Sequence, residues 1–263
     1  MPRDPNYPFD VFCGNDQNMF SQTPATASAA HVPFNMDGPS KELLGSVKRL
    51  HSNGDYSDLT IVCDGKHYRV HKCIICPRSD FFAAACRGGF KEAREGKISL
   101  PDDDPKAVDL MIWYFYHLDY EVHGAGGATG QLPPGMSSIA VIDSELMVHA
   151  KVYALAEKYL IGSLKSLALE KFKRQAFKDW SKDSFLEAAQ AVYELTMESD
   201  TELRGAVVMT LGEHTSLLDK ESTKNLLITT SRLAYDLLMH IHRRGEFRET
   251  SVFNQLPLVR RRI

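Results

Sequence analysis

The hydrophobic pattern of the chain begins at Ser40, after a proline-rich stretch. Residues 1–39 contain the small polar run TPATASAA and prolines at several positions: Pro2, Pro5, Pro8, Pro24, Pro33 and Pro39. This composition breaks regular structure and offers little to bury, so we predict a disordered or loosely attached arm. Apolar residues then recur at helical spacing behind Ser40 as N-cap: Leu43, Leu44, Val47 and Leu50. A helix is predicted over residues 41–51.

The segment DLTIVCDGKHYRVH, residues 58–71, alternates apolar and polar positions and predicts a β-hairpin. Apolar side chains share one face of the two predicted strands: Leu59, Ile61, Cys63, Tyr68 and Val70. Between the strands lies Asp64-Gly65, a dipeptide that tolerates positive φ at both central positions of a tight turn. The opposite face of the second strand is predicted to carry His67, Arg69 and His71.

Further elements follow at short intervals. CIICPRSDFFAAAC predicts two short helices that pivot near Pro77, and KISL at residues 97–100 predicts a short strand. Asp104-Pro105 is typical of a helix start, with Asp as N-cap and Pro at the first helical position. The buried stripe of that helix is predicted to consist of Val108, Met111, Ile112 and Phe115. The run DYEVH predicts a brief extended stretch, and residues 124–139 predict a flexible surface insertion.

From Asp143 onward the spacing predicts helices only. Apolar stripes recur in two successive helices: Val148, Val152, Leu155, Tyr159, Leu164, Leu167, Ala168 and Phe172. Ser184-x-x-Glu187 predicts a capping box that opens the next helix. ELRGAVVMTLGEH and NLLITTSRLAYDLLMHIH predict two more helices. The predicted fold class is α+β, with a small sheet wrapped by helices and followed by an all-helical extension.

Composition narrows the class of protein. The chain is 43% hydrophobic and 25% charged with a net charge of −3, so it has no global basic field to attract nucleic acid. No apolar run approaches the ~20 residues that a membrane-spanning helix needs, and the N-terminus lacks the apolar stretch of a secretory signal. Five scattered cysteines fit reduced thiols. We expect an intracellular soluble protein, cytoplasmic and/or nuclear, without a membrane partner.

The cluster KHYRVHKCIIC suggests a zinc site made of His67, His71, Cys73 and Cys76. A structural zinc site needs four tetrahedral ligands, usually in two pairs separated by a dozen or more residues. On a strand the two histidines would lie about 13 Å apart, at ~3.3 Å per residue, which is too far for one ion. Cys63 and Cys86 remain as additional ligand candidates, but free cysteine is commonly buried. We predict no metal site and interpret the cysteines as small core residues.

Other chemistry is not indicated. GAGGATG has the composition of a phosphate-binding loop, but it runs into QLPPGM rather than into a helix. Common hydrolase and nucleotide-binding signatures are absent from the sequence, so we predict no catalytic residues and no cofactor, and expect the protein not to be an enzyme. The basic end, residues 243–263, is interpreted as a solvated tail, with a nuclear import signal as the alternative.

Two longer strings resemble the BTB (POZ) domain: YSDLTIVCDGKHYRVHKCIICPRSDFFAAAC and GGFKEAREGKISLPDDDPKAVDLMIWYFYHLDY. The order of features carries the resemblance. Asp58 opens the first strand, the hairpin ends in His71-Lys72, and Ser79-x-x-Phe82 follows on a helix. Phe90-Lys91-Glu92, a strand ending in Leu-Pro and an amphipathic helix ending in aromatic residues come next. Farther on, HAKVYALAEKYLIGSLKSLALEKF resembles the last helices of that domain.

The resemblance implies a fold, domain boundaries and a class of function. A small mixed sheet with a hairpin, surrounded by helices, is expected over residues 40–178, interrupted by the insertion at 124–139. A helical extension is expected at 179–242. Members of this family are protein-interaction platforms without metal or cofactor. On this basis His71 should hydrogen-bond locally, while two thiols should pack under the sheet: Cys73 and Cys76.

Three candidate surfaces come from the same resemblance. Self-association through the N-terminal helix would use Leu43, Leu44, Val47 and Leu50. Docking of a cullin scaffold, so that the protein presents substrates for ubiquitination, would use Phe90 and Glu92, although GGFKEAREG also reads as a polar loop in which Phe90 covers the sheet. A charged pocket, used by some transcriptional members to recruit corepressors, corresponds to Asp58 and Lys72, with Lys where other members carry Arg.

Two functions are therefore expected from the resemblance. The first is a self-associating interaction module that could serve as substrate adaptor of a cullin-RING ubiquitin ligase. The alternative is a nuclear transcriptional or chromatin-associated regulator that acts through BTB-mediated dimerisation. No kelch, zinc-finger, MATH or ankyrin segment is recognised in the sequence, so the partner or substrate is not identified by it.

Overall fold

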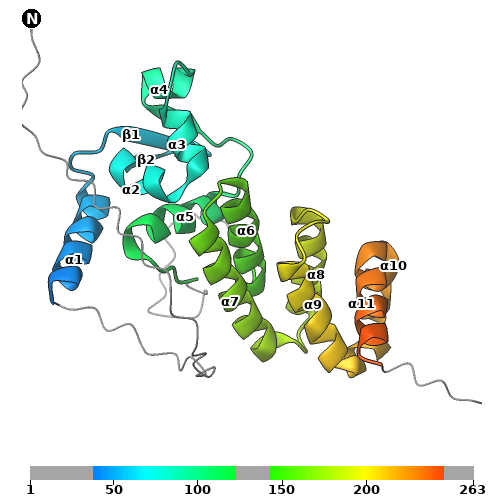
Figure 1. Ribbon diagram of the computed structural model, residues 1–263. Coiled ribbons are helices and arrows are strands. Elements are labelled where there is room, and N and C mark those ends of the chain that lie inside the picture. The colour runs from blue at the N-terminus through cyan, green and yellow to red at the C-terminus, as the bar shows by residue number, and fades with distance from the viewer. Residues whose placement is uncertain (1–37, 123–142, 246–263) are drawn as a thin grey trace, which may run out of the picture. The chain divides into compact units, whose positions relative to one another are not determined.

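The computed structural model describes residues 38–122 and 143–245 (Figure 1). The predicted arm up to residue 37, the predicted insertion at 124–139 and the basic tail from residue 246 onward lie outside the described residues. Within the described ranges a small sheet is followed by many helices, which confirms the predicted α+β class.

The sheet of the described region is mixed and has the strand order β2-β1-β3, formed by Leu59–Cys63 (β1), Lys66–Val70 (β2) and Lys97–Ser99 (β3). β1 pairs antiparallel with β2 and parallel with β3, so that Ile61 lies opposite Tyr68 on one side and Ile98 on the other. The turn between β1 and β2 has φ of 46° at Asp64 and 73° at Gly65. This geometry confirms the predicted hairpin turn, since both residue types tolerate positive φ.

The alternation of the hairpin ends with its second strand. The expected apolar face of the hairpin is buried, and His67 and Arg69 are exposed on the other face, as alternation requires. His71, for which the alternation predicts the face of His67 and Arg69, is only 2% exposed. β2 ends at Val70, so the strand alternation no longer applies at the next residue.

The first group of helices surrounds the sheet: Gly38–Asn53 (α1), Lys72–Ile75 (α2), Cys76–Arg78 (the 3₁₀ turn η1), Asp80–Cys86 (α3), Lys91–Glu95 (α4) and Pro105–His117 (α5). α1 begins two residues before the predicted N-cap Ser40. The Ser79 hydroxyl accepts the Phe82 N–H at 3.1 Å and caps α3. The Asp104 carboxylate accepts the Ala107 N–H at 2.9 Å, which confirms the predicted start of α5.

The second group of helices follows residue 143: Glu145–Lys158 (α6), Gly162–Asp179 (α7), Asp183–Leu195 (α8), Glu202–Glu213 (α9), Thr215–Asp219 (the 3₁₀ turn η2), Glu221–Thr229 (α10) and Ser231–Arg243 (α11). The predicted capping box is wrong, because α8 starts at Asp183 and Ser184 lies inside it. The single helix predicted over NLLITTSRLAYDLLMHIH is two helices, separated at Thr230 with ψ of 71°. Among the helices of residues 38–122 and 143–245, none combines the length and apolar character needed to cross a bilayer.

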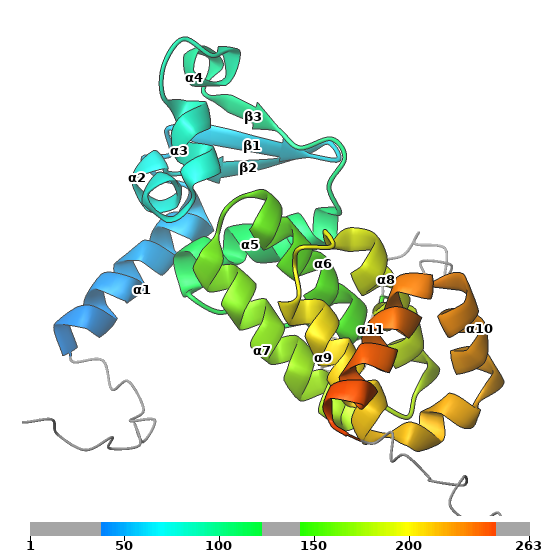
Figure 2. The ribbon, with the colours of Figure 1, turned by 45° about the vertical axis from the view of Figure 1, so that its right-hand side comes forward.

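Helix packing joins the two groups. α6 and α7 pack along each other, and α5 packs on α6 (Figure 2). α8 packs mainly on α6, and α9 packs on α7. One apolar cluster of buried side chains extends from Leu59 in β1 to Leu237 in α11. Four tyrosines are almost completely buried in it: Tyr116, Tyr120, Tyr153 and Tyr159. Each buried hydroxyl needs a polar partner, and those partners define several of the contacts described below.

Candidate interaction surfaces

The predicted dimer stripe lies on α1, which buries none of its side chains. Leu43 is 68% exposed, while Leu44, Val47 and Leu50 are half-buried. α1 packs against α5, and Val47 contacts the apolar core of its own domain. The four residues therefore do not form one free surface. Leu43 faces solvent, and Val47 also contributes to packing within the chain.

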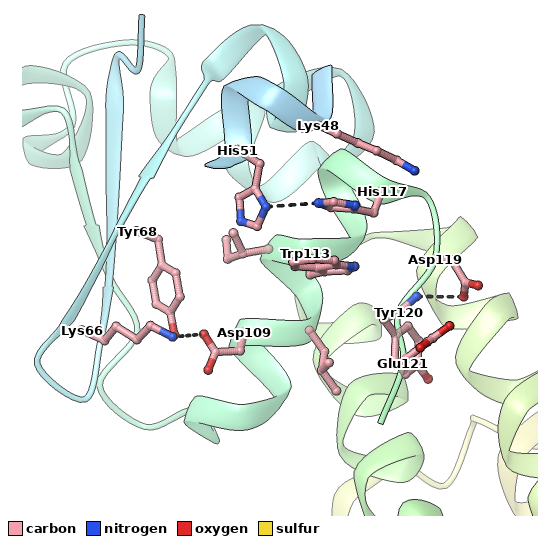
Figure 3. A pocket seen from close by; sticks show the side chains of 12 residues that line it. Lys48, His51, Lys66, Tyr68, Asp109, Trp113, His117, Asp119, Tyr120 and Glu121 are labelled. Carbon is pink, nitrogen blue, oxygen red and sulfur yellow. Dashed lines mark hydrogen bonds and ion pairs between the residues drawn. The ribbon is translucent and has the colours of Figure 1, made fainter. Parts of the chain in front are cut away.

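The C-terminal turn of α1 is attached to α5 by two histidines that the sequence did not single out. His51 Nδ1 lies 3.3 Å from His117 Nε2, His51 stacks on Tyr116, and His117 stacks on Trp113 at 3.7 Å between ring centroids (Figure 3). Burial lowers the pKa of both histidines. His71 near His51, and then His51 and Lys48 near His117, lower it further, because an added positive charge beside them is unfavourable. The pair is therefore held uncharged near neutral pH.

A cavity of about 730 Å³ lies beside this histidine pair. Its walls come from α1, β2, α5 and the segment after α5, as Figure 3 shows for Lys48, Tyr68 and Trp113. Lys66 and Asp109 form an ion pair across β2 and α5. Burial, together with the Asp109 carboxylate, raises the pKa of the Tyr68 phenol, which stays protonated. The cavity thus presents aromatic surface with paired charges at its edge.

The candidate charged pocket, Asp58 and Lys72, is brought together by the structure, but through the backbone. The Asp58 carboxylate accepts the N–H of Lys72 at 2.8 Å, where α2 begins. A carboxylate at a helix N-terminus satisfies a free N–H and favours the helix dipole. Asp58 therefore stabilises the passage from the hairpin into α2, whatever else it binds.

His71 stabilises the same passage. Its Nδ1 lies 2.8 Å from the Tyr116 hydroxyl, its Nε2 lies 2.6 Å from the Asp55 carbonyl oxygen, and its backbone N–H donates to the Tyr116 hydroxyl at 3.0 Å. Both ring nitrogens are thus occupied by protein atoms. The partners are not local in sequence, because Tyr116 lies on α5.

The cysteines behave only partly as predicted. Cys63 is buried and Cys76 packs against the core, but Cys73 is exposed, so the expectation that it packs under the sheet is wrong. α2 is only one turn long, and Ile75 takes its buried position. Burial, with Cys86 beside it, raises the pKa of Cys76 to about 11. In the described part of the chain, no three His, Cys, Asp or Glu side chains are grouped to hold a metal ion.

The candidate cullin-docking residues lie at the start of α4. Phe90 is the N-cap of this helix and is 65% exposed, and Glu92 lies in its first turn, half-buried. The alternative reading of GGFKEAREG as a polar loop with Phe90 covering the sheet is wrong, because residues 91–95 are helical and the ring faces solvent. α4 contacts α3 and β3, which place this aromatic side chain at the surface.

A further surface was missed by sequence reasoning. A groove of about 760 Å³ lies between the ends of α6 and α7 and the α8–α9 connection, with exposed apolar side chains: Leu160, Leu195 and Met197. Beneath it the Tyr153 hydroxyl donates to Asp200 at 2.7 Å, and the Lys165 ammonium pairs with Asp200 at 2.9 Å. No local sequence pattern predicts this groove, because its residues are separated along the chain by whole helices.

Comparison with known proteins identifies the first part of the chain. The family model of the BTB/POZ domain matches residues 47–129. These residues are a BTB/POZ domain. The match covers the hairpin, Asp58, His71 and the Phe90 region, which confirms the resemblance stated from the sequence. A BTB domain is a protein-interaction module, and its exposed surfaces are the relevant candidates for function.

Curated relatives match a minority of the chain. BTB/POZ domain-containing protein 9 of Mus musculus is 33% identical over 63 residues, which are 24% of this chain and 10% of that protein. Kelch-like protein 26 of Danio rerio is 30% identical over 89 residues, which are 34% of this chain and 15% of that protein. The chain thus spans a small part of the length of the relatives it matches.

Two solved structures are among those similar to this chain. The BTB domain of zebrafish PATZ1 is 13% identical, with a TM-score of 0.38 over 54% of this chain and 98% of that one. The BTB domain of human Gigaxonin is 16% identical, with a TM-score of 0.34 over 57% of this chain and 98% of that one.

Proposed function

We propose that this protein self-associates through α1 and acts as a substrate adaptor of a cullin-RING ubiquitin ligase. The observation that carries the first part is α1 itself, a helix of 16 residues without a single buried side chain. A helix that is covered on one side only by α5 and carries Leu43 at 68% exposure leaves apolar surface for a second copy. The BTB domain, whose match begins within α1, supports this reading, because such domains are interaction modules.

Substitution of Leu43 by Glu tests self-association. In the full chain we expect Leu43→Glu to convert the dimer to monomer in multi-angle light scattering, because the charge would be buried unpaired at the interface. Its thermal unfolding should stay close to wild type, since Leu43 is exposed in the single chain. Lys41→Glu, on another face of α1, is the matched control and should leave the dimer intact. A monomeric wild-type protein, or a dimeric Leu43→Glu variant, contradicts the proposal.

Val47→Glu separates two roles of the stripe. Because Val47 contacts the core of its own domain, this variant should lose thermal stability as well as self-association. We therefore expect Leu43→Glu to lose the dimer without unfolding, and Val47→Glu to unfold. If both variants unfold alike, the stripe serves packing within the chain.

The adaptor role rests on the start of α4. Phe90 at 65% exposure and Glu92 half a turn away combine an apolar anchor with a carboxylate on a surface helix, as expected from the family resemblance. Relatives named Kelch-like protein match 85 to 89 residues of the chain at 24–30% identity, which supports the proposal without extending their activities to this chain.

A binding assay with a purified cullin scaffold tests the adaptor role. The double variant Phe90→Ala with Glu92→Ala should bind at least about tenfold more weakly, because an exposed aromatic anchor typically contributes more than 1 kcal/mol. Lys91→Ala, between the two positions, is the matched control and should bind as wild type does. Equal binding by the double variant removes the proposed site, and absence of binding by the wild-type chain removes the adaptor role.

We propose that the protein works in the cytoplasm, the nucleus or both. The alternative role as a nuclear regulator would use the candidate charged pocket of Asp58 and Lys72. It has weaker support, because the Asp58 carboxylate already accepts a hydrogen bond from the backbone N–H of Lys72. Fluorescence microscopy of the full chain and of a variant without residues 258–263 tests this alternative. Nuclear accumulation that disappears with the deletion would support it, and an unchanged distribution would remove its basis.

A further inference from the structure

A hollow of about 470 Å³ lies where the segment after α5 meets α6 and α7. Side chains from three elements converge on it: Tyr120 from the segment after α5, His149 from α6, and Arg174 and Lys178 from α7. Neither the predicted dimer stripe nor the candidate cullin-docking residues line this hollow. Its volume is in the range of about 300–1,000 Å³ typical of ligand sites.

The buried end of the hollow is formed by a hydrogen-bonded pair, His149 and Tyr120. His149 is 6% exposed and Tyr120 is 1% exposed, and His149 Nδ1 lies 2.9 Å from the Tyr120 hydroxyl. Burial raises the pKa of Tyr120, so its hydroxyl keeps its proton and needs an acceptor. In the described region that acceptor is Nδ1, and a neutral imidazole that accepts there carries its proton on Nε2.

This Nε2–H has no acceptor among the described residues. Burial lowers the pKa of His149 to about 4, with Lys171 and then Arg174 contributing, so the ring is neutral at pH 7. The charged neighbours that act on His149 are both cations, although Glu121 and Glu145 also line the hollow. The buried end of the hollow therefore offers a hydrogen-bond donor that has two cations, Lys171 and Arg174, beside it.

Two further cations remain available at the hollow. Lys171 is already engaged, because its ammonium donates to the Tyr120 carbonyl oxygen at 2.8 Å and pairs with Asp119 at 2.8 Å. Arg174 and Lys178 lie one turn apart on α7, both exposed, and neither forms an ion pair with another described residue. A guanidinium, an ammonium and a buried imidazole N–H thus line one hollow. None of the three donates there to another described residue, although the carboxylates of Glu121 and Glu145 line the hollow too.

We propose that this hollow binds a phosphate monoester, held by the Nε2–H of His149, the guanidinium of Arg174 and the ammonium of Lys178. A phosphoryl group offers three terminal oxygens to three kinds of donor, and Arg binds such oxygens bidentately. A carboxylate carries a single negative charge, whereas a phosphate monoester carries about −1.5 to −2 at pH 7, so the two cations favour the phosphate. For an interaction module the fitting source is a phosphorylated side chain of a partner protein; a free phosphate has the same chemistry. The inference does not depend on α1 or α4.

Isothermal titration calorimetry of the full chain at constant ionic strength tests the site with four probes. These are inorganic phosphate, acetate, a capped Gly-phosphoserine-Gly peptide and its unphosphorylated form. Binding of the phosphopeptide but not of the unphosphorylated peptide supports a partner's side chain as the source, and binding of inorganic phosphate alone supports the free anion. Acetate binding as tightly as phosphate, or no phosphate probe binding below about 10 mM, overturns the proposal.

Variants locate the binding on these residues. Arg174→Gln is exposed and should fold normally, and we expect it to weaken phosphate binding at least about tenfold through the loss of a charge-assisted hydrogen bond. Lys173→Gln removes an equal charge from the adjacent exposed position, which does not line the hollow, and should bind as wild type does. His149→Asn keeps a polar group for Tyr120 and removes the Nε2 donor, so it should also weaken binding. Equal weakening by Arg174→Gln and Lys173→Gln would show attraction to general charge and overturn the site.

Discussion

The helices of the chain begin in two different ways. α3, α5 and α6 each start at a residue whose side chain accepts a backbone N–H of the first turn: Ser79, Asp104 and Ser144. The N-cap residues of α8, α9, α10 and α11 form no such side-chain hydrogen bond, although Asp200, just before the α9 N-cap, accepts the Glu202 N–H at 3.2 Å. Cap residues lie within three positions of the N–H that they bind, so a capped helix start is determined by residues that are close along the chain.

The uncapped helices depend on contacts between distant residues. The buried Arg204 guanidinium on α9 donates to the Thr196 carbonyl oxygen at 2.5 Å and to the Tyr193 carbonyl oxygen at 3.3 Å, both at the end of α8. The Tyr193 hydroxyl donates to Asp236 on α11 at 2.9 Å. In this second set, polar contacts between helices stabilise the positions of helices whose starts lack a side-chain cap at the N-cap residue.

The largest expected effect concerns α6, which has a cap and also carries the buried His149. The pKa of His149 is about 4 in the folded chain, against an ordinary value of 6.5 once the chain is unfolded, so the unfolded chain takes up a proton first as the pH falls. Stability is therefore full above about pH 7 and declines toward pH 4, by about 3 kcal/mol at ~1.4 kcal/mol per pKa unit. Urea unfolding at pH 7, 5.5 and 4 measures this.

The variant His149→Asn isolates this contribution. It should flatten the decline between pH 7 and pH 4, although His51 and His117, whose pKa values are also lowered, act in the same direction. An unchanged slope in the variant would contradict the assignment to His149. The stability of α6 would then depend on its local cap and not on the buried His149.

The second effect tests the uncapped set directly. Arg204→Ala should destabilise the chain by about 2 kcal/mol, because two carbonyl groups at the end of α8 lose a charged donor in a buried position. Arg232→Ala is the matched control, since that guanidinium is exposed in ion pairs and should cost about 0.5 kcal/mol or less. Equal losses in the two variants, measured by chemical unfolding, would remove the distinction between the helix sets.

A third effect concerns a local cap. Ser144→Ala should destabilise the chain by about 1 kcal/mol, because the Met147 N–H loses its acceptor, the Ser144 hydroxyl at 3.2 Å. The unfolding midpoint in urea measures the change, and Ser144→Asp, which restores an acceptor, should recover it. A loss in Ser144→Asp as large as that in Ser144→Ala would show that capping is not the cause.

The smallest effect is expected where the sequence predicted a cap and the structure has none. Ser184→Ala should change the free energy of unfolding by less than about 0.5 kcal/mol, because Ser184 lies inside α8 and Ala favours a helix interior. A capping box would instead make this change cost about 1 kcal/mol. A measured loss of that size would restore the prediction and weaken the comparison between the two sets.

The sequence carried the fold further than it carried the sites. The hairpin, its Asp64-Gly65 turn, the strand at 97–99 and the start of α5 followed from neighbours a few residues apart. The sequence-based predictions fail where contacts between distant residues override the local pattern. The ring of His71 is buried by Tyr116 and Asp55, and the helix predicted across Thr230 is divided there.

The candidate sites show the same division. Sequence and resemblance singled out the dimer stripe and the Phe90 region, which stay predictions for binding. They missed the His51–His117 contact and the hollow at His149, whose members lie on different elements. No spacing rule connects residue 120 with residue 174. A motif search therefore finds the hairpin and passes over these contacts.

By itself, the sequence determined the alternation of the hairpin, the residues that tolerate positive φ in its turn, and the Asp104 cap at the start of α5. Those features follow from interactions between residues that are close along the chain, where the backbone geometry is nearly the same in any fold. The tertiary structure alone decided that Cys73 is exposed, that His71 is buried, and that His149 and Arg174 line the same hollow. The physical reason is that burial and electrostatic surroundings depend on which distant segments pack together, and local periodicity does not specify that choice.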